Sequence, residues 1–216
     1  MNTSLLDLFL PPERGADSRV YGVVTAVVTN NQDPEGLGRV KLKFPWLSDE
    51  EESDWARVAT PMAGKERGLF LLPEVEDEVL VAFERGDPRF PYVIGSLWNK
   101  NAPPPLTNDD GKNDLRILKS RSGHVVRLND KDGEESIEIV DKSEKNSIVI
   151  STKDDTITIT AEADVTIESK TGKLILKGKD GVEITSGSAF KAEVQADAEI
   201  KASGQVTVKG STINLN

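Results

Sequence analysis

The sequence predicts an all-β protein whose C-terminal part is a trimeric intertwined β-helix, a triangular prism with repeats of about eight residues. From Ile148 onward, pairs of apolar residues two positions apart recur about every eight positions. Alternation over four or five residues is typical of a β-strand with one apolar face. Turn residues such as Lys170-Thr171-Gly172 separate the pairs, and no segment shows a convincing helical period.

The repeat is too short for one chain to enclose a core by itself. A rung of a single-chain β-solenoid uses roughly 18 to 25 residues, whereas eight residues cross only one side. Three chains that each supply one side close a turn with about 24 residues, and the apolar pairs then point inward. At about 4.8 Å per strand, the repeat forms a rod on the order of 45 Å long. The period therefore predicts an obligate homotrimer.

The predicted trimer core consists of the inward apolar residues of this repeat. These residues are Ile148, Ile150, Ile157, Ile159, Val165, Ile167, Leu174, Leu176, Val182, Ile184, Ile200, Val206 and Val208. Two alternatives are less favourable. An open monomeric meander leaves an apolar sheet and two strand edges exposed to water. Disorder does not account for the Thr, Lys, Glu and Ser residues that occupy the alternate positions.

Composition and charge restrict the class of protein. With 37% hydrophobic and 30% charged residues, the chain falls among soluble globular proteins. We expect no membrane span, because no apolar run approaches about 20 residues, and no secretory signal, because the N-terminus lacks a basic start. The absence of cysteine excludes disulfides. A net charge of −10 disfavours binding to nucleic acids.

Prolines and aromatic residues divide the chain. All 11 prolines lie at or before Pro105, and Phe190 is the only aromatic residue after residue 100. We predict an N-terminal arm (1–19), a small closed barrel (20–100), a connector and β neck (101–146) and a β-helix spike (147–216). The predicted strands of the barrel and neck are residues 21–29, 38–44, 55–59, 68–72, 78–83, 92–96, 115–118, 124–128 and 137–140.

The sequence offers no convincing catalytic or metal site. His124 is the only histidine and lies in a predicted strand without a second ligand at metal-binding spacing, so we expect a structural role. The acidic segment 74–78 is explained by solvated charges at the start of a strand. No serine has a His/Asp arrangement to activate it. We therefore expect neither enzymatic activity nor a cofactor or bound metal.

Several ordered segments carry a family resemblance. They are 31–41 (NQDPEGLGRVK), 44–46 (FPW), 54–58 (DWARV), 73–79 (PEVEDEV), 86–89 (GDPR), 91–97 (PYVIGSL), 120–128 (SRSGHVVRL), 137–139 (IEI) and 146–150 (NSIVI). Over roughly residues 20 to 216, the chain resembles the phage baseplate assembly protein V family and the spike portion of VgrG proteins. The resemblance implies an OB-fold barrel followed by a trimeric β-helix, the central spike of a contractile injection machine.

This resemblance also implies partners and a location. The chain is too short for the larger hub region of VgrG proteins, so a separate hub protein is expected to link the trimer to the tail tube. The apolar C-terminal end, Ile213, Asn214, Leu215 and Asn216, is expected to contact a PAAR-type tip protein. The spike is made in the cytoplasm, assembles into a phage tail or injection-particle baseplate, and pierces the target membrane. The alternative is a trimeric receptor- or glycan-binding fibre that uses its OB barrel.

Overall fold

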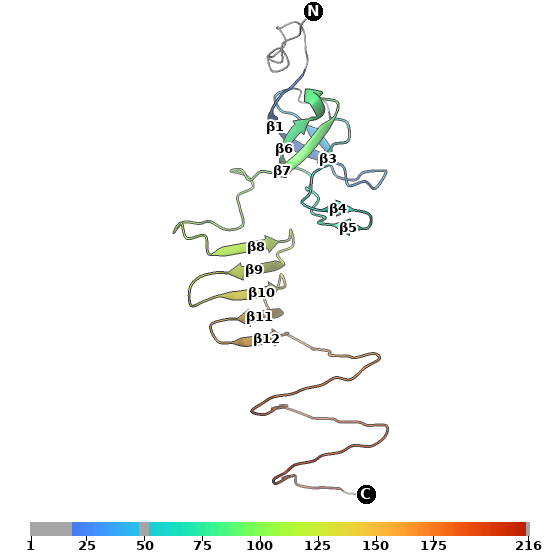
Figure 1. The fold of residues 1–216 in the computed structure, drawn as a ribbon, viewed down its shortest axis with the longest axis vertical. Helices are drawn as coiled ribbons and strands as arrows, with labels where there is room; N and C mark the ends of the chain where they lie inside the picture. The colour runs from blue at the N-terminus through green and yellow to red at the C-terminus, as the bar shows by residue number, and fades with distance from the viewer. Residues whose placement is uncertain (1–18, 48–51, 215–216) are drawn as a thin grey trace, which may run out of the picture. The chain divides into compact units, whose positions relative to one another are not determined.

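A computed structural model describes residues 19–47 and 52–214. The chain divides into two units, one up to Thr160 and the other from Ala161, and each is described by itself. Regular structure in the described part is β throughout, except for the single 3-10 turn η2 (Glu84–Gly86) (Figure 1). The prediction of an all-β chain is confirmed. Among residues 19–47 and 52–214, no helix has the length and apolar character needed to cross a bilayer.

The first sheet curls into a barrel. Its strand order is β2-β1-β6-β7-β3, with antiparallel pairing except between β7 and β3, which are parallel. The strands are β1 (Val23–Asn30), β2 (Lys41–Lys43), β3 (Arg57–Val58), β6 (Glu78–Phe83) and β7 (Pro91–Ser96). Beside the two edge strands, Val40 and Ala56 exchange backbone hydrogen bonds of 3.0 and 2.7 Å. These two bonds bring the edges together and close the barrel at one point.

Alternation along the strands produces the core of this barrel. In β6, Val79, Val81 and Phe83 point inward and the residues between them stay partly exposed, as expected for a strand with one apolar face. The Phe83 ring packs against Phe44 with a centroid distance of 5.5 Å. The buried core comprises Ala26, Val28, Val40, Leu42, Phe44, Ala56, Val79, Val81, Phe83 and Val93.

One predicted barrel strand does not form. Residues 68–72 were expected to be a strand, but only the short hairpin β4 (Ala63–Gly64) and β5 (Arg67–Gly68) is present there. Gly68 has a φ of 153°, and a Cβ at this position would lie 2.6 Å from the Met62 carbonyl oxygen. This close approach requires glycine and turns the chain, so the apolar residues 69–72 continue outside any ladder.

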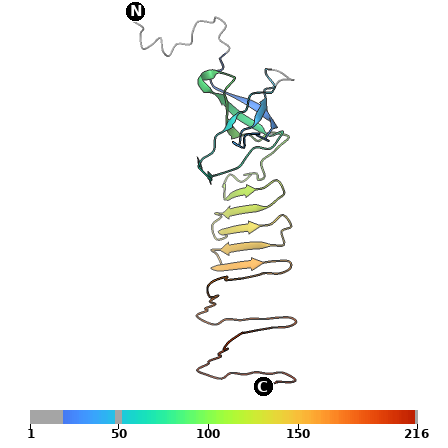
Figure 2. The same cartoon turned by 90° about the vertical axis from the view of Figure 1, so that its right-hand side faces the viewer.

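A second sheet contains five strands in sequence order, each antiparallel to the next. The strands are β8 (Leu115–Lys119), β9 (Val125–Asn129), β10 (Ser136–Val140), β11 (Ser147–Ser151) and β12 (Thr156–Thr160). They follow one another like the rungs of a ladder (Figure 2). The strands expected for the neck correspond to β8, β9 and β10. The proposed boundary between neck and spike at residue 147 falls within this sheet, between β10 and β11.

The second unit is an extended chain with regular bends. No strand occurs among residues 161–214. The backbone bends at 162–163, 170–172, 179–180, 187–188, 195–196, 203–204 and 211, so the bends recur every eight or nine residues. The sequence repeat is therefore also a repeat of the backbone, with one straight segment for each apolar pair.

Candidate functional site

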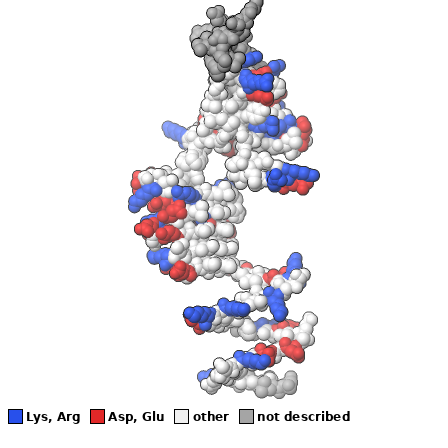
Figure 3. Space-filling view, in the orientation of Figure 1, with Lys and Arg blue, Asp and Glu red and all other residues white. Residues whose placement is uncertain are grey.

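The second sheet presents one continuous apolar face. Side chains directly opposite each other in the ladder form two columns across the strands. One column contains Leu118, Val126, Ile139, Ile148 and Ile159, and the other contains Leu128, Ile137, Ile150 and Ile157. These residues are called the apolar face below. Figure 3 shows a broad area without charged side chains over these strands.

The apolar face is uncovered in the single chain. All its side chains are exposed, up to 71% for Ile157 and 58% for Ile159. A groove of about 530 Å³ lies on it, with Val126, Ile139 and Ile148 in its lining. Soluble monomers rarely leave a contiguous apolar area of this kind in contact with water, because its burial is worth about 25 cal/mol per Å². The face is therefore built to be covered by another surface.

The reverse face of the same sheet carries charged and polar side chains, together with the apolar Ile117, Val125, Val140 and Val149. Arg127 on β9 and Glu138 on β10 lie directly opposite each other, and their side chains form an ion pair of 2.7 Å. Ser136 donates a hydrogen bond of 3.0 Å to the second carboxylate oxygen of Glu138. On β12, Thr156, Thr158 and Thr160 also belong to this face. The two faces thus differ as expected for a sheet with one side in a core and one in water.

The structure brings four of the predicted core residues together on the apolar face: Ile148, Ile150, Ile157 and Ile159. The others lie in the second unit, and all of them are exposed: Val165, Ile167, Leu174, Leu176, Val182, Ile184, Ile200, Val206 and Val208. Ile213 is also exposed, and Asn214 is the last described residue. Leu215 and Asn216, predicted to contact a tip protein, lie outside the described residues, as do residues 1–18 of the predicted arm.

The part of the apolar face that lies on β8, β9 and β10 was not predicted as core from the sequence. Leu118, Val126, Leu128, Ile137 and Ile139 were placed in neck strands but were not named as core. Part of this signal was present in the sequence, because Val126 and Leu128 form an apolar pair two positions apart, as do Ile137 and Ile139. Leu118 has no apolar residue two positions away. Because ladder pairing continues from β8 to β12, the register connects these residues to Ile148 and Ile159.

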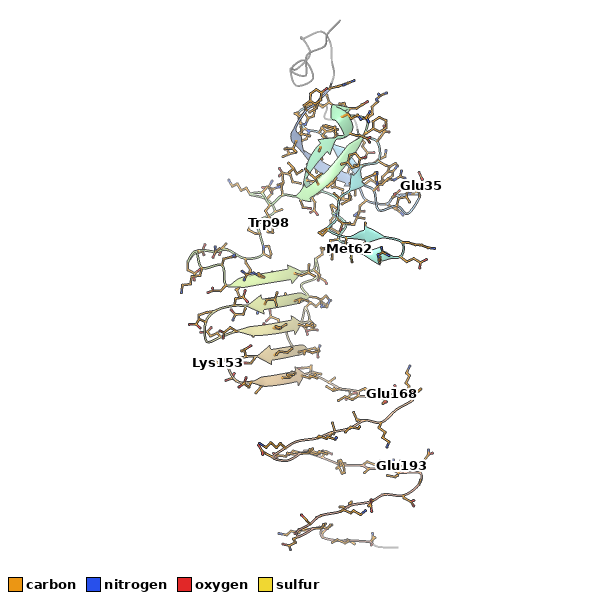
Figure 4. All side chains as sticks on the ribbon, in the orientation of Figure 1. Glu35, Met62, Trp98, Lys153, Glu168 and Glu193 are labelled. Carbon is orange, nitrogen blue, oxygen red and sulfur yellow. The ribbon has the colours of Figure 1, made fainter. Side chains whose placement is uncertain are left out.

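In the barrel, a single carboxylate organises the loop between β1 and β2. The Asp33 side chain is 3% exposed and accepts backbone hydrogen bonds from Glu35, Leu37 and Arg39. The Arg39 guanidinium also binds both Asp33 oxygens, at 2.9 and 2.7 Å. The hydrogen bonds from the Arg39 side chain hold the pKa of Asp33 well below its ordinary value of 3.8. From this loop, Glu35 projects into solvent (Figure 4).

Replacing Asp33 by asparagine is expected to lower the melting temperature of the barrel by about 5 °C at pH 7. Because folding depresses the pKa of Asp33, its contribution is complete above the ordinary value and is lost as the pH falls below about 4. The wild type should therefore lose more stability between pH 5 and pH 2 than Asp33→Asn. Tryptophan fluorescence measures this, since all three tryptophans precede residue 101. Equal pH dependence of both proteins would contradict the assignment.

The other polar residues considered as sites have structural partners. His124 Nδ1 accepts a hydrogen bond of 3.2 Å from the backbone N–H of Lys142. In the acidic segment, Asp77 accepts a hydrogen bond of 2.9 Å from the backbone of Glu74, and Glu78 accepts one of 2.7 Å from Asn99. No group of three or more His, Cys, Asp or Glu side chains suited to a metal ion occurs among the residues that the structure describes.

Comparison with known protein families relates the barrel to one kind of domain. The model for the injector OB domain of type VI secretion systems and phage baseplates matches residues 24–98. Residues 24–98 are therefore similar to an injector OB domain. The match covers the curled sheet with its parallel β3–β7 pair. The resemblance to baseplate protein V and VgrG-type spikes that the sequence indicated is confirmed.

Curated relatives extend the similarity beyond the OB domain. The type VI secretion system spike protein VgrG4b of Pseudomonas aeruginosa is 35% identical over 142 residues, which cover 60% of this chain and 18% of the relative. VgrG1b of the same organism is 32% identical over 63% of this chain and 20% of its own length. VgrG3 of Vibrio cholerae is 36% identical over 45% of this chain and 10% of its own. This chain thus spans about a fifth or less of these relatives.

Proposed function

We propose that this protein is the homotrimeric central spike of a contractile injection machine, placed between a hub at the tail tube and a tip protein. The observation that carries the proposal is the exposed apolar face, continued along the chain by the bent repeat with its exposed Ile and Val residues. Two further copies of the chain cover these surfaces in the proposed trimer. The similarity to type VI secretion system spike proteins supports the same role.

The proposed mechanism is mechanical. In the trimer, ladders between chains occupy the backbone groups of residues 161–214, which form no strand in the single chain. A strand can leave such a rod only by exposing apolar surface, at about 25 cal/mol per Å². Many residues contribute, so the rod remains straight under the thrust of contraction and transmits force along its axis. Stiffness is thus the property that lets the spike pierce a membrane.

The two proposed partner proteins bind at opposite ends of the spike. A separate hub protein receives the OB domain and links it to the tail tube. A PAAR-type tip protein covers the apolar end, where Ile213 is exposed. The net charge of −10 disfavours any role in holding nucleic acid. The protein is made in the cytoplasm and assembles into the baseplate.

The solution mass of the purified full chain tests this proposal. We expect light scattering to give three times the mass of one 23.5 kDa chain. The trimer should also persist in detergent gels without heating, because no strand can separate without exposing its apolar residues. A monomer of 23.5 kDa would contradict the closed prism and the spike function together.

A further inference from the structure

The trimer of the proposed function, on which this inference rests, dictates which residues meet across chains. If each repeat unit advances by one strand and one side of the prism, a unit of one chain lies against the next unit of a second chain. The other edge of the unit in the first chain lies against the preceding unit of the third chain. For units of eight residues, residue i then lies beside residue i+8 of one neighbour and residue i−8 of the other. The side chains between the apolar residues point outward and face solvent.

The outward positions carry charges of alternating sign at this spacing. In three successive units, the residue between the first two inward residues is Glu183, then Lys191, then Glu199. Each lies eight residues after the previous one. At the next outward position, Glu193 is followed eight residues later by Lys201. Glu168 and Lys177 show the same alternation across a unit of nine residues. The alternation ends at Lys209, which follows Lys201.

The structure shows that these charges share a face within each unit. The Lys191 Nζ atom lies 2.5 Å from a carboxylate oxygen of Glu193, so both side chains project to the same side of the extended segment. Glu199 and Lys201 form an ion pair of the same kind in the next unit. The order of the charges is reversed between the two units, basic then acidic in one and acidic then basic in the other. Figure 3 shows charged side chains projecting along the repeat, and Figure 4 labels Glu193 there.

We propose that this checkerboard, consisting of Lys191, Glu193, Glu199 and Lys201, binds a second copy of the chain and sets its register. Lys191 of one chain pairs with Glu199 of the next, and Glu193 pairs with Lys201. Opposite charges directly across neighbouring strands are favourable, and like charges are unfavourable. Each pair occurs three times in a trimer, so the small individual contributions accumulate.

The apolar core alone does not define this register. Most units place a similar pair of apolar residues inward, so a chain that slips by one unit still fills the core. The same slip brings Glu183 of one chain beside Glu199 of its neighbour, where two carboxylates repel each other. It also places Glu193 beside Lys177 and Lys209, but these two opposite-charge contacts replace the four of the correct alignment. The outward charges therefore distinguish the correct alignment from the slipped one, while the inward residues supply most of the stability.

The test exchanges charges without changing composition. The first variant, Lys191→Glu with Glu193→Lys, keeps the ion pair within its own unit but opposes like charges between chains. The second variant, Glu199→Lys with Lys201→Glu, does the same from the other unit. The combined variant carries all four changes and restores opposite charges between these two units. The net charge of the chain is the same in all four proteins, so each variant is the matched control of the others.

The dissociation rate of each trimer in urea is the measurement, since guanidinium would screen the charges. We expect each exchange alone to speed dissociation by about tenfold or more, and the combined variant to recover most of the wild-type rate. High salt should reduce these differences. Equal rates in all four proteins, or additive loss in the combined variant, would overturn the proposal while the trimer itself stands. A monomeric wild type would instead contradict the proposed function.

Discussion

Replacing Ile157 by aspartate is expected to abolish assembly of the trimer. Ile157 lies on the apolar face of β12, opposite Ile150, and is the most exposed residue of that face in the single chain. In the trimer, the substitution places three carboxylates at one level of the axis. Their desolvation and mutual repulsion cost roughly 10 kcal/mol or more, which exceeds what a single strand layer contributes. Val182→Asp, in the second unit, is also expected to prevent trimer assembly. Light scattering gives the solution mass of both variants.

Thr158→Asp is the matched control for this substitution. Thr158 is the neighbour of Ile157 in the same strand but belongs to the reverse face, opposite Val149. We expect the Thr158→Asp protein to remain a trimer with a urea midpoint close to the wild type. If Ile157→Asp and Thr158→Asp had the same effect, the assignment of the inward face would be wrong.

A cysteine pair eight residues apart is expected to produce a covalent trimer. The natural chain has no cysteine, so Thr185→Cys with Glu193→Cys introduces the only two thiols. In an intertwined rod, these positions lie on adjacent strands of different chains, about 4.8 Å apart, which suits a disulfide. Each chain then links to both neighbours, and the ring of three closes. A heated, non-reducing detergent gel of the oxidised protein reports the result.

The control for this experiment shifts one cysteine by a further repeat. Thr185→Cys with Lys201→Cys separates the thiols by two strands, about 9.6 Å, which is too far for a disulfide without backbone movement. This variant should run as single chains under the same conditions. A monomer with an internal disulfide in the first variant would show instead that each chain folds back on itself.

The strands of both sheets were largely predictable from local pattern. In β6, alternation between apolar and polar positions and the preceding turn at 74–77 located both ends of the strand. The neck strands were located equally well, since Asp132-Gly133 and Ser122-Gly123 mark turns between alternating segments. The strand predicted at residues 68–72 was wrong because the four consecutive apolar residues 69–72 resemble a buried strand. The constraint at Gly68, a close approach to the Met62 carbonyl, is a tertiary contact that no local pattern reveals.

The extent of the apolar face was harder to predict than its existence. Ile148 and Ile159 were recognised through the eight-residue repeat, whereas Val126 and Ile139 belong to hairpins with longer and unequal turns. The eight-residue spacing of apolar pairs is therefore absent from the sequence of β8 to β10, although the apolar face includes these strands. Only the register of the ladder, which places Val126 opposite Ile139 and Ile139 opposite Ile148, shows that one surface includes both regions.

The change from hairpins to an unpaired repeat after Thr160 determines the order of folding. Strands β8 to β12 pair with their neighbours in sequence, so their contacts are local and form rapidly within each chain. Residues 161–214 form no strand within their own chain, so in the proposed trimer they pair only after three chains have met. We therefore expect assembly of the proposed trimer to begin with the encounter of three preformed sheets and to proceed toward the C-terminus. Its rate depends on protein concentration at the first step and on chain length afterwards.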